Sequence, residues 1–596
     1  MNSASRFLRL LPPALAVLAA SSTAQVPDDV AAAIKREGLE NSQAMALLDH
    51  LTNEIGHRLT GSSNYTRACL WAKEQFEAMG LEVELEPWAT WRNGWNRGQW
   101  TGRVVSPVDM ELQIATPAWT AGTAGRVSGQ LLPMPTTEEE LAELGDALDG
   151  AYLFDLRTIP SDEPPADGER RRGRGRRRGG VPDFLREVAA ERGVAGFVSS
   201  SRGTDEYPNR IRVFADRRAS PWLARTLPTI PEIVVRQDQA KRLRWLMNHS
   251  DDVEVEFDIR NRFQGEVELH NVVAELKGTE KPDEYVVVCG HLDSWHQATG
   301  TTDNGTGATS TMEAARILTA IGAKPRRTIR FCLWGGEEQG LMGSREHVNR
   351  RREEMERISC ALNHDTGTNW AHRLTVTEAM EPLMAEAMAH VMTLTPPDPE
   401  HEGDVFDLRS RETISAGGGS DHASFGQAGV PGLGWGLTGR SDYFNYTWHT
   451  QWDTFDVAIP EYQRHTATVI ALTALGVANL PELLPREGVK RGRGAGDATA
   501  MLSQAMDVEM DGLTFKSVTA DGMAAKAGIQ TGDRLLKVNG QAVKRMSEMF
   551  PILREAGFDK DVELTLQRGD TEAKAKLNFA GGRGGRDRPR GRRRRI

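Results

Sequence analysis

The fold is decided by the stretch Val286–Glu338, which begins VVVCGHLDSWHQATGTTDNGTG and ends TIRFCLWGGEE. Val286–Cys289 and Ile329–Leu333 are short, largely apolar runs rich in β-branched and aromatic residues, a pattern typical of strands buried on both faces. The Ala-rich segment Thr306–Gly322 between them is long enough for a crossover helix. The stretch therefore predicts a βαβ unit with two parallel strands.

Polar side chains begin where these strands stop. His291 and Asp293 follow the first strand, Glu337 and Glu338 follow the second, and Asp303 lies on a Gly-rich loop before the helix. The carboxyl ends of strands border the ligand crevice of open α/β sheets. Imidazole and carboxylate groups together suit zinc, and two adjacent ions need one carboxylate that bridges them. We therefore expect a metal site at this edge.

Each of these residues taken alone has a plainer explanation. An acidic residue such as Asp303 at a helix N-terminus is often only a cap. Paired glutamates usually form a solvated surface, and one histidine after a strand is more often structural. Their joint placement at strand ends favours the metal site.

Two later segments add metal-binding side chains. Ile358–Leu362 is a third apolar strand, and Asp365 follows it. His449 precedes a long helix predicted over Ile459–Leu480. The chain thus offers two histidines and three carboxylates, enough for two zinc sites that share Asp303.

Six motifs occur in one order across Asn271–Leu480: GHLDSW, TDNGTG, GGEEQGLMGS, NHDTGT, GSDHASF and WHTQWDT. In these motifs the chain resembles the co-catalytic zinc exopeptidases, peptidase family twenty-eight, which include bacterial leucyl aminopeptidases and glutamate carboxypeptidases. The resemblance implies two Zn²⁺ per chain, one held by His291, Asp303 and Asp365 and the other by Asp303, Glu338 and His449. It also implies that Glu337 is the general base and that Asp293 accepts the other ring N–H of His291.

The segment Gly417–Phe425, GGGSDHASF, resembles the substrate-pocket loop of that family and would place Ser420, Asp421 and His422 near the scissile bond. Chemistry alone identifies only a Gly-rich loop with polar groups. Tyr443 and Tyr446 could each donate to an oxyanion, with a structural role as the alternative.

The specificity of the site stays open at the level of sequence. An aminopeptidase needs acidic groups for a free ammonium, whereas a carboxypeptidase needs a basic clamp for a carboxylate. The sequence places neither group.

A chain of 596 residues is expected to form several domains. The expected fold is α/β, with a three-layer catalytic domain built on a mostly parallel mixed sheet, an α+β insertion that resembles protease-associated domains, and a PDZ domain suggested by AAKAGIQTGDRLLKVNGQAV. The expected boundaries are a signal peptide at 1–24, the catalytic domain at 25–117 and 263–484, the insertion at 118–262, a linker at 485–500, the PDZ domain at 501–580 and a basic tail at 581–596.

The N-terminus has the composition of a secretory signal. Arg6 and Arg9 precede the apolar stretch Leu10–Ala20, and small residues follow at 22–24. We expect export to the periplasm or outside the cell, with a membrane anchor as the alternative. The four cysteines fall in segments predicted to be buried and are interpreted as structural thiols: Cys69, Cys289, Cys332 and Cys360.

The outer segments suggest further partners. The PDZ module would bind a peptide C-terminus along a sheet edge, with a packing or spacing role as the alternative. The Arg-rich segment 168–180 and the tail are expected to be disordered, and the tail would be attracted to anionic surfaces. The net charge of −10 argues against a specific nucleic-acid-binding protein.

These observations predict a secreted two-zinc exopeptidase that hydrolyses short peptides, as an aminopeptidase or as a dipeptidase or carboxypeptidase. One rival is a single-zinc glutaminyl cyclase on the same fold. The other is a non-enzymatic scaffold that uses the insertion and the PDZ module.

Overall fold

The computed structural model describes residues 26–160, 180–215, 227–490, 506, 508–520, 522–543, 549, 552 and 561–578. The predicted signal peptide, the basic tail, most of the linker and residues 168–179 lie outside the described residues. No helix in the described ranges is long and apolar enough to cross a lipid bilayer.

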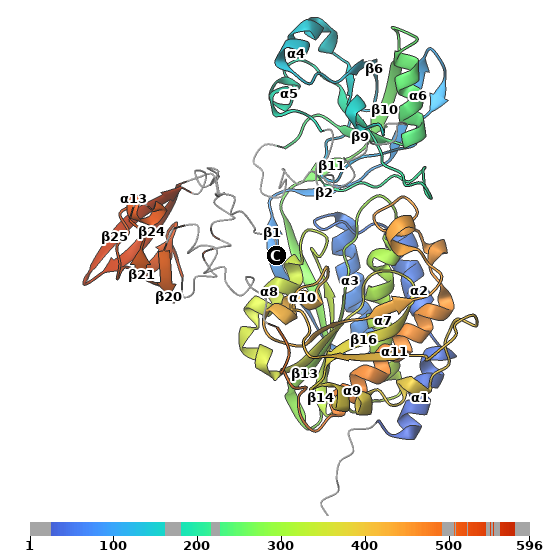
Figure 1. Ribbon diagram of the computed structural model, residues 1–596, viewed down its shortest axis with the longest axis vertical. Helices are drawn as coiled ribbons and strands as arrows, with labels where there is room; N and C mark the ends of the chain where they lie inside the picture. Colours follow the sequence, from blue (N-terminus) through green and yellow to red (C-terminus); the bar gives the residue numbers. More distant parts are fainter. Residues whose placement is uncertain are drawn as a thin grey trace, which may run out of the picture.

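The catalytic domain is built on a six-stranded mixed sheet (Figure 1). Its strands, in spatial order, are β1 (Glu82–Trp91), β12 (Val267–Leu276), β14 (Arg327–Trp334), β13 (Lys281–His291), β15 (Ile358–Asn363) and β18 (Gly432–Gly434). The last four are mutually parallel, while β12 and the edge strand β1 run antiparallel to their neighbours. The predicted βαβ unit is confirmed, with α7 (Thr306–Ala320) as its crossover helix.

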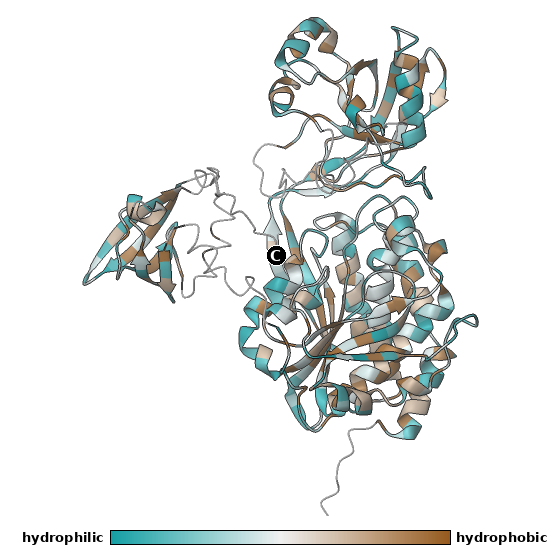
Figure 2. Cartoon of the chain, viewed as in Figure 1, coloured by the Kyte–Doolittle hydropathy of each residue, from teal (hydrophilic) through white to brown (hydrophobic). Residues whose placement is uncertain are grey.

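Alternate residues of β13 face different cores. Val286 and Val288 pack into the core that includes residues of α3 (Ser63–Ala78), α7 and α11 (Pro460–Asn479), whereas Val287 and Cys289 pack with α8 (Met342–Arg350) and α10 (His422–Gln427). The central strands are correspondingly apolar (Figure 2). Because helices cover both faces, the domain has the three layers that were predicted.

Further elements of this domain flank the six-stranded sheet. They are α1 (Asp28–Leu39), α2 (Ala44–Asp49), α9 (Glu381–Ala387) and a small sheet of β17 (Asp407–Arg411), β16 (Trp370–Thr377) and β19 (Gly436–Thr438). All four cysteines are buried and free, as predicted for structural thiols.

The insertion forms an eight-stranded sheet of its own. Its strands are β4 (Met110–Glu111), β3 (Trp100–Ser106), β10 (Glu254–Ile259), β6 (Arg126–Pro133), β7 (Tyr152–Phe154), β8 (Gly196–Ser200), β9 (Glu232–Val235) and β5 (Ile114–Ala115). Its helices are α4 (Glu138–Leu144), α5 (Asp183–Val188) and α6 (Gln237–Met247).

This sheet corrects the expected start of the insertion at residue 118. It already includes β3, β4 and β5, so it begins at Trp100. β3 looks like an ordinary strand in the sequence, and only its pairing with β10 assigns it to the insertion. The short ladder of β2 (Gly94–Asn96) with β11 (Arg262–Gln264) lies between the two domains (Figure 1).

The C-terminal module has a separate antiparallel sheet. It contains β20 (Val508–Asp511), β21 (Thr514–Val518), β22 (Arg534–Val538), β23 (Gln541–Ala542), β24 (Asp561–Arg568) and β25 (Thr571–Asn578), with the short helix α13 (Met523–Lys526). Its buried apolar residues form a cluster that includes no residue of the catalytic domain or the insertion among those described. The module therefore has its own core.

Candidate metal centre

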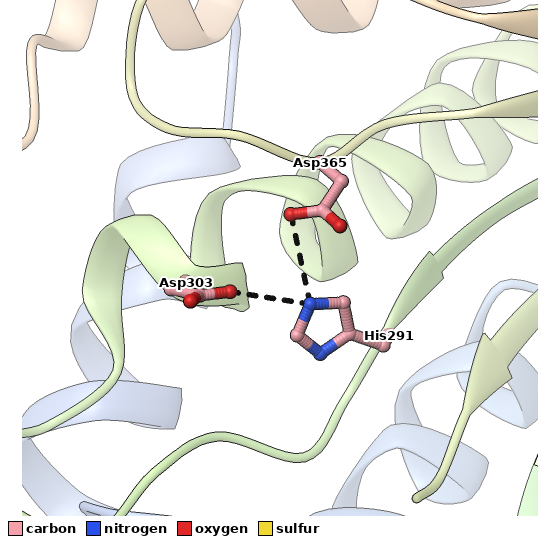
Figure 3. Close-up of side chains that lie close together, drawn as sticks. All are labelled: His291, Asp303 and Asp365. Atoms are coloured by element: carbon pink, nitrogen blue, oxygen red, sulfur yellow. Dashed lines mark ion pairs between the residues drawn. The ribbon is translucent and has the colours of Figure 1, made fainter. Parts of the chain in front are cut away.

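The first group of predicted ligands meets at the carboxyl edge of the catalytic sheet. His291 is the last residue of β13, Asp303 lies in η5 (Thr301–Gly305) before α7, and Asp365 follows β15. The Nε2 atom of His291 is 3.3 Å from Oδ1 of Asp303 and 3.6 Å from Oδ1 of Asp365 (Figure 3). Three segments distant in sequence thus converge on one point.

The second group lies on the other side of Asp303. The Nε2 atom of His449 is 2.9 Å from Oδ2 of Asp303 and 3.2 Å from Oε2 of Glu338. The two carboxylate oxygens of Asp303 therefore face different histidines. This is the arrangement required of a carboxylate that bridges two cations.

The donor atoms fit zinc. Ligands held at about 2.0–2.1 Å around a tetrahedral centre lie about 3.3 Å apart, close to the observed separations. In each triad, one atom from each residue lies within 4.8 Å of the others. Nε2 of His291, Nε2 of His449 and Oε1 of Glu338 are buried without a hydrogen-bond partner among the described residues. Unsatisfied buried polar atoms are costly, and bound cations would satisfy them.

The electrostatics of the isolated side chains also favour bound cations. Burial, followed by the charge of Asp303, raises the pKa of Glu338 to about 7. Burial opposes protonation of His449, but the carboxylates of Glu338 and Asp303 outweigh it and raise its pKa to about 9. The site therefore holds more negative charge than its own side chains neutralise.

Asp293 departs from its predicted role. The Nδ1 atom of His291 is 2.9 Å from the main-chain oxygen of Asp293 and 3.6 Å from its carboxylate. The buried carboxylate instead accepts hydrogen bonds from the backbone N–H groups of Glu337 at 3.2 Å and Glu338 at 3.3 Å, and from the Thr60 hydroxyl at 2.9 Å. Asp293 thus orients His291 through its carbonyl and the two glutamates through its side chain.

Asp453 is a positioning residue that the sequence reasoning missed, although it lies within the quoted motif WHTQWDT. Its buried carboxylate accepts hydrogen bonds from the backbone N–H of Thr302 at 2.6 Å and of Asp303 at 3.2 Å, and from the Thr302 hydroxyl at 2.8 Å. The segment that carries His449 is thereby joined to the loop that carries Asp303. An acidic residue four positions after His449 was the available signal.

Arg58 was also missed. Its guanidinium is fully buried and donates to the carbonyls of Leu292 at 2.7 Å, Thr299 at 2.7 Å and Gly300 at 2.7 Å. Burial lowers its pKa to about 10. Arg58 therefore stabilises the backbone of the segment between His291 and Asp303 by hydrogen bonds.

Glu337 lies beside the first triad, with Oε2 at 3.9 Å from Nε2 of His291. Its side chain is 9% exposed and is not a member of either triad. Burial raises its pKa well above the ordinary value, and the neighbouring carboxylates of Asp365 and Asp421 add to the effect. A carboxylate with a raised pKa is suited to accept and return a proton.

The residues predicted to lie in the substrate pocket form two groups, the segment Ser420–His422 and the tyrosines Tyr443 and Tyr446. Ser420 accepts a hydrogen bond from Nδ2 of Asn363 at 2.9 Å. The buried carboxylate of Asp421 has no hydrogen-bond partner among the described residues, and burial raises its pKa to about 7. His422 begins α10 next to them, and its buried Nδ1 atom has no hydrogen-bond partner in the part of the chain that the structure describes. Their place near a scissile bond stays a prediction.

The two tyrosines have different surroundings. Tyr446 stacks on Trp452, with ring centroids 4.8 Å apart, and lies 5.3 Å from the ring of Tyr207 in the insertion. Tyr443 is buried against Gly367, two residues after Asp365. Burial raises the pKa of Tyr443, and the charges of Asp303 and Asp365 raise it further. Of the two, Tyr443 is the one close to the carboxylates of the candidate metal centre.

A small pocket opens beside the second triad. It is lined by Trp295, Gln297, Ala298, Gly300, Asp303, His449, Thr450 and Asp453. The candidate metal centre therefore borders a small pocket.

Parts of the chain are similar to known proteins. Residues 271–473 match Peptidase family M28, and residues 514–568 match a PDZ domain. Carboxypeptidase Q of Bos taurus is 26% identical over 453 residues, which cover 75% of this chain and 88% of the relative. An aminopeptidase of Pseudomonas aeruginosa (strain UCBPP-PA14) is 26% identical over 317 residues, 52% of this chain and 54% of the relative.

A solved structure supports the same fold. The crystal structure of a Peptidase M28 precursor from Shewanella amazonensis SB2B aligns with a TM-score of 0.55 and 26% sequence identity. The alignment covers 77% of this chain and 98% of that chain.

Proposed function

We propose, from the match of residues 271–473 to Peptidase family M28, that this chain is a two-zinc exopeptidase acting on short peptides. The observation that carries the proposal is the convergence of His291, Asp365, Glu338 and His449 on the two faces of Asp303. A single-zinc cyclase would need only one of the two triads. The second triad therefore favours the peptidase over that rival.

The side chains of the site have different roles in the proposed hydrolysis. Zinc ions held by the two triads around Asp303 would lower the pKa of a coordinated water and would polarise the scissile carbonyl. Glu337 accepts the proton of the attacking water and returns it to the leaving amine. Asp293 holds the backbone of Glu337 and Glu338, so that one glutamate faces the substrate while the other remains a ligand.

Tyr443 is the candidate donor to the developing oxyanion. A tyrosine hydroxyl is protonated at neutral pH, the raised pKa of Tyr443 leaves it so, and a protonated phenol can donate a hydrogen bond. The carboxylates around it would otherwise repel negative charge on the substrate.

The experiment is a combined measurement of metal content and hydrolysis. We expect about two zinc ions per chain, cleavage of unblocked dipeptides, loss of cleavage on chelation and recovery when zinc is restored. One zinc per chain with glutaminyl cyclisation would support the cyclase. A zinc-loaded chain inactive on every amino-acid and peptide amide would overturn the peptidase.

The N-terminal composition supports a second proposal, export from the cytoplasm. Fractionation of cells that express the full chain, with N-terminal sequencing of the mature protein, tests it. Cleavage after Ala24 is expected, whereas an intact Met1 in the cytoplasmic fraction would contradict it.

A further inference from the structure

A surface pocket lies between α8 and α10, two helices of the catalytic domain that lie side by side (Figure 1). It leaves about 310 Å³ of space, its open mouth included. None of its lining residues is a candidate metal ligand or a candidate substrate-pocket residue, so this pocket is separate from the candidate metal centre. Its polar lining residues are Arg345 and Asn349 of α8, Arg352 just after α8, and Ser424 and Gln427 of α10.

The two arginines of this pocket have no acidic partner in the described part of the chain. Both are exposed, and neither Arg345 nor Arg352 forms an ion pair or a side-chain hydrogen bond there. By contrast, Arg350 and Arg351, which lie between them in the sequence, pair with carboxylates at 2.9 and 2.7 Å. No acidic residue lines the pocket among the described residues. The two unpaired positive charges therefore favour an anion as the ligand.

The pocket also contains a hydrogen-bond acceptor that lacks a donor. Oε1 of Gln427 is buried and has no hydrogen-bond partner among the described residues. A buried carbonyl oxygen without a donor costs free energy, which a suitable ligand would recover. A ligand that satisfies the whole pocket must therefore carry negatively charged oxygens for the arginines and one donor for Gln427.

Phosphate carries both kinds of group. Guanidinium groups donate paired hydrogen bonds to charged phosphate oxygens. Near neutral pH, inorganic phosphate also keeps an O–H group that can donate to a carbonyl oxygen. Sulfate has a similar shape but no O–H group at this pH. The difference between the two anions therefore reports on the acceptor in the pocket.

We propose that the pocket between α8 and α10 binds a phosphate group, with Arg345 and Arg352 donating to its charged oxygens and Gln427 accepting from its O–H group. Free phosphate and a phosphate monoester share this chemistry.

Bound phosphate would connect two helices that begin next to the candidate metal centre. α8 begins four residues after Glu338, and α10 begins directly after Asp421. The hydroxyl oxygens of Ser344 and Ser424 already join the two helices, 2.8 Å apart. Gln427 lies about one helical turn beyond this serine pair. Phosphate would therefore stabilise the packing of α8 against α10, and with it the two loops that precede these helices.

The test measures the Tm of the catalytic transition of the zinc-loaded full chain. Phosphate, sulfate or methyl phosphate is added up to about 20 mM at pH 6.5, with the ionic strength held constant by sodium chloride because exposed charges are screened by salt. Phosphate is expected to raise the Tm by about 3 °C in a saturable manner, and sulfate by less than about half as much.

The variants separate this pocket from the zinc ions, which also attract phosphate. The double variant Arg345→Gln, Arg352→Gln should weaken phosphate binding about 10-fold or more. Gln427→Met should reduce the effect of phosphate to that of sulfate. Arg350→Gln is the matched control, because Arg350 lies on the same helix but outside the pocket, and its response to phosphate should equal that of the wild type.

The ester identifies the source of the phosphate group. Methyl phosphate that stabilises as strongly as phosphate would assign the pocket to phosphate esters, and a smaller shift would assign it to free phosphate; both support the site. An equal Tm shift in the wild type and in the double arginine variant would overturn the site, because phosphate would then bind zinc or act as an adventitious ion only. Equal shifts with phosphate and sulfate would overturn the selectivity for phosphate.

Discussion

Substitution of Asp303 is expected to affect metal binding more than substitution of any other single side chain in the candidate metal centre. Its two oxygens face His291 at 3.3 Å and His449 at 2.9 Å, whereas each other ligand belongs to one triad. Asp303→Asn should therefore reduce the zinc content from about two ions per chain towards none. Asp365→Asn should remove about one.

Metal analysis after dialysis at a fixed free zinc concentration measures this difference. Asp442→Asn is a suitable control, because this acidic residue lies in the same region but belongs to neither triad. Equal zinc content in the Asp303 and Asp365 variants would argue against a bridging carboxylate.

Glu337 is expected to act on the proton without holding the metal. Glu337→Gln keeps the size of the side chain but removes the base, so kcat should fall about 10²- to 10⁴-fold while zinc content stays at about two. Steady-state kinetics and metal analysis on the same preparation test the pair of outcomes. A variant that loses zinc together with activity would instead make Glu337 a ligand.

Asp293 is expected to control the geometry of the two glutamates. In Asp293→Asn, one carboxylate oxygen becomes an NH₂ group that faces a backbone N–H of Glu337 or Glu338. An unsatisfied buried donor costs about 1–3 kcal/mol, so both Tm and kcat should fall. Thr60→Val, which removes only the hydroxyl bond to Asp293, should have the smaller effect.

At the scale of elements, Glu86 joins the edge strand β1 to α8. Its buried carboxylate accepts hydrogen bonds from Nδ1 of His347 at 2.9 Å, Nε of Arg351 at 2.9 Å and Nδ2 of Asn271 at 3.1 Å. Burial alone would raise the pKa of Glu86, but the contacts with His347, Arg351 and Asn271 outweigh it, and the pKa lies well below its ordinary value of 4.5.

The low pKa of Glu86 predicts a pH-dependent stability. A carboxyl group with a depressed pKa in the folded state stabilises the fold fully above its unfolded pKa, and this contribution shrinks as the pH falls towards the folded value. Glu86→Gln should cost about 3 kcal/mol at pH 7, and the difference from wild type should narrow below pH 4.5. Urea unfolding of both proteins in excess chelator measures it without a contribution from bound metal.

The neighbouring surface pair provides the control for this experiment. Glu346 and Arg350 lie on α8, the helix that carries His347, and their side chains are 2.9 Å apart and partly exposed. Such pairs contribute about 0.5 kcal/mol to the free energy of unfolding. Glu346→Gln should therefore show little change at either pH. A pH-independent loss in Glu86→Gln would show that packing, and not the charge, is responsible.

At the scale of the whole molecule, the separate core of the PDZ module predicts that the catalytic domain folds and acts without this module. Truncation after Lys490 removes a cluster that shares no residue with the other described cores. Dipeptide hydrolysis and the Tm of the catalytic transition should stay close to the full-length values, as measured by kinetics and calorimetry. A large loss of either would show that the module supports the catalytic domain.

Unlike the PDZ module, the insertion is not expected to be independent of the catalytic domain. Its residues Asn209 and Ile211 hydrogen-bond to Gln451 on the loop of His449, and its sheet begins at Trp100, inside the segment first expected to be catalytic. The catalytic domain and the insertion therefore share the surroundings of the metal centre.

The sequence by itself determined the parallel strands β13, β14 and β15, the crossover helix α7 and the position of the ligands after the strands. These features are local, because the apolar runs and the polar residues that follow them are consecutive in the chain. Only the tertiary structure decided that the Asp293 carboxylate holds the two glutamates, that Tyr443 rather than Tyr446 lies near the carboxylates, and that Arg210 reaches the loop of His449. Those features depend on the direction of side chains and on contacts between segments far apart in the chain, which no local pattern specifies.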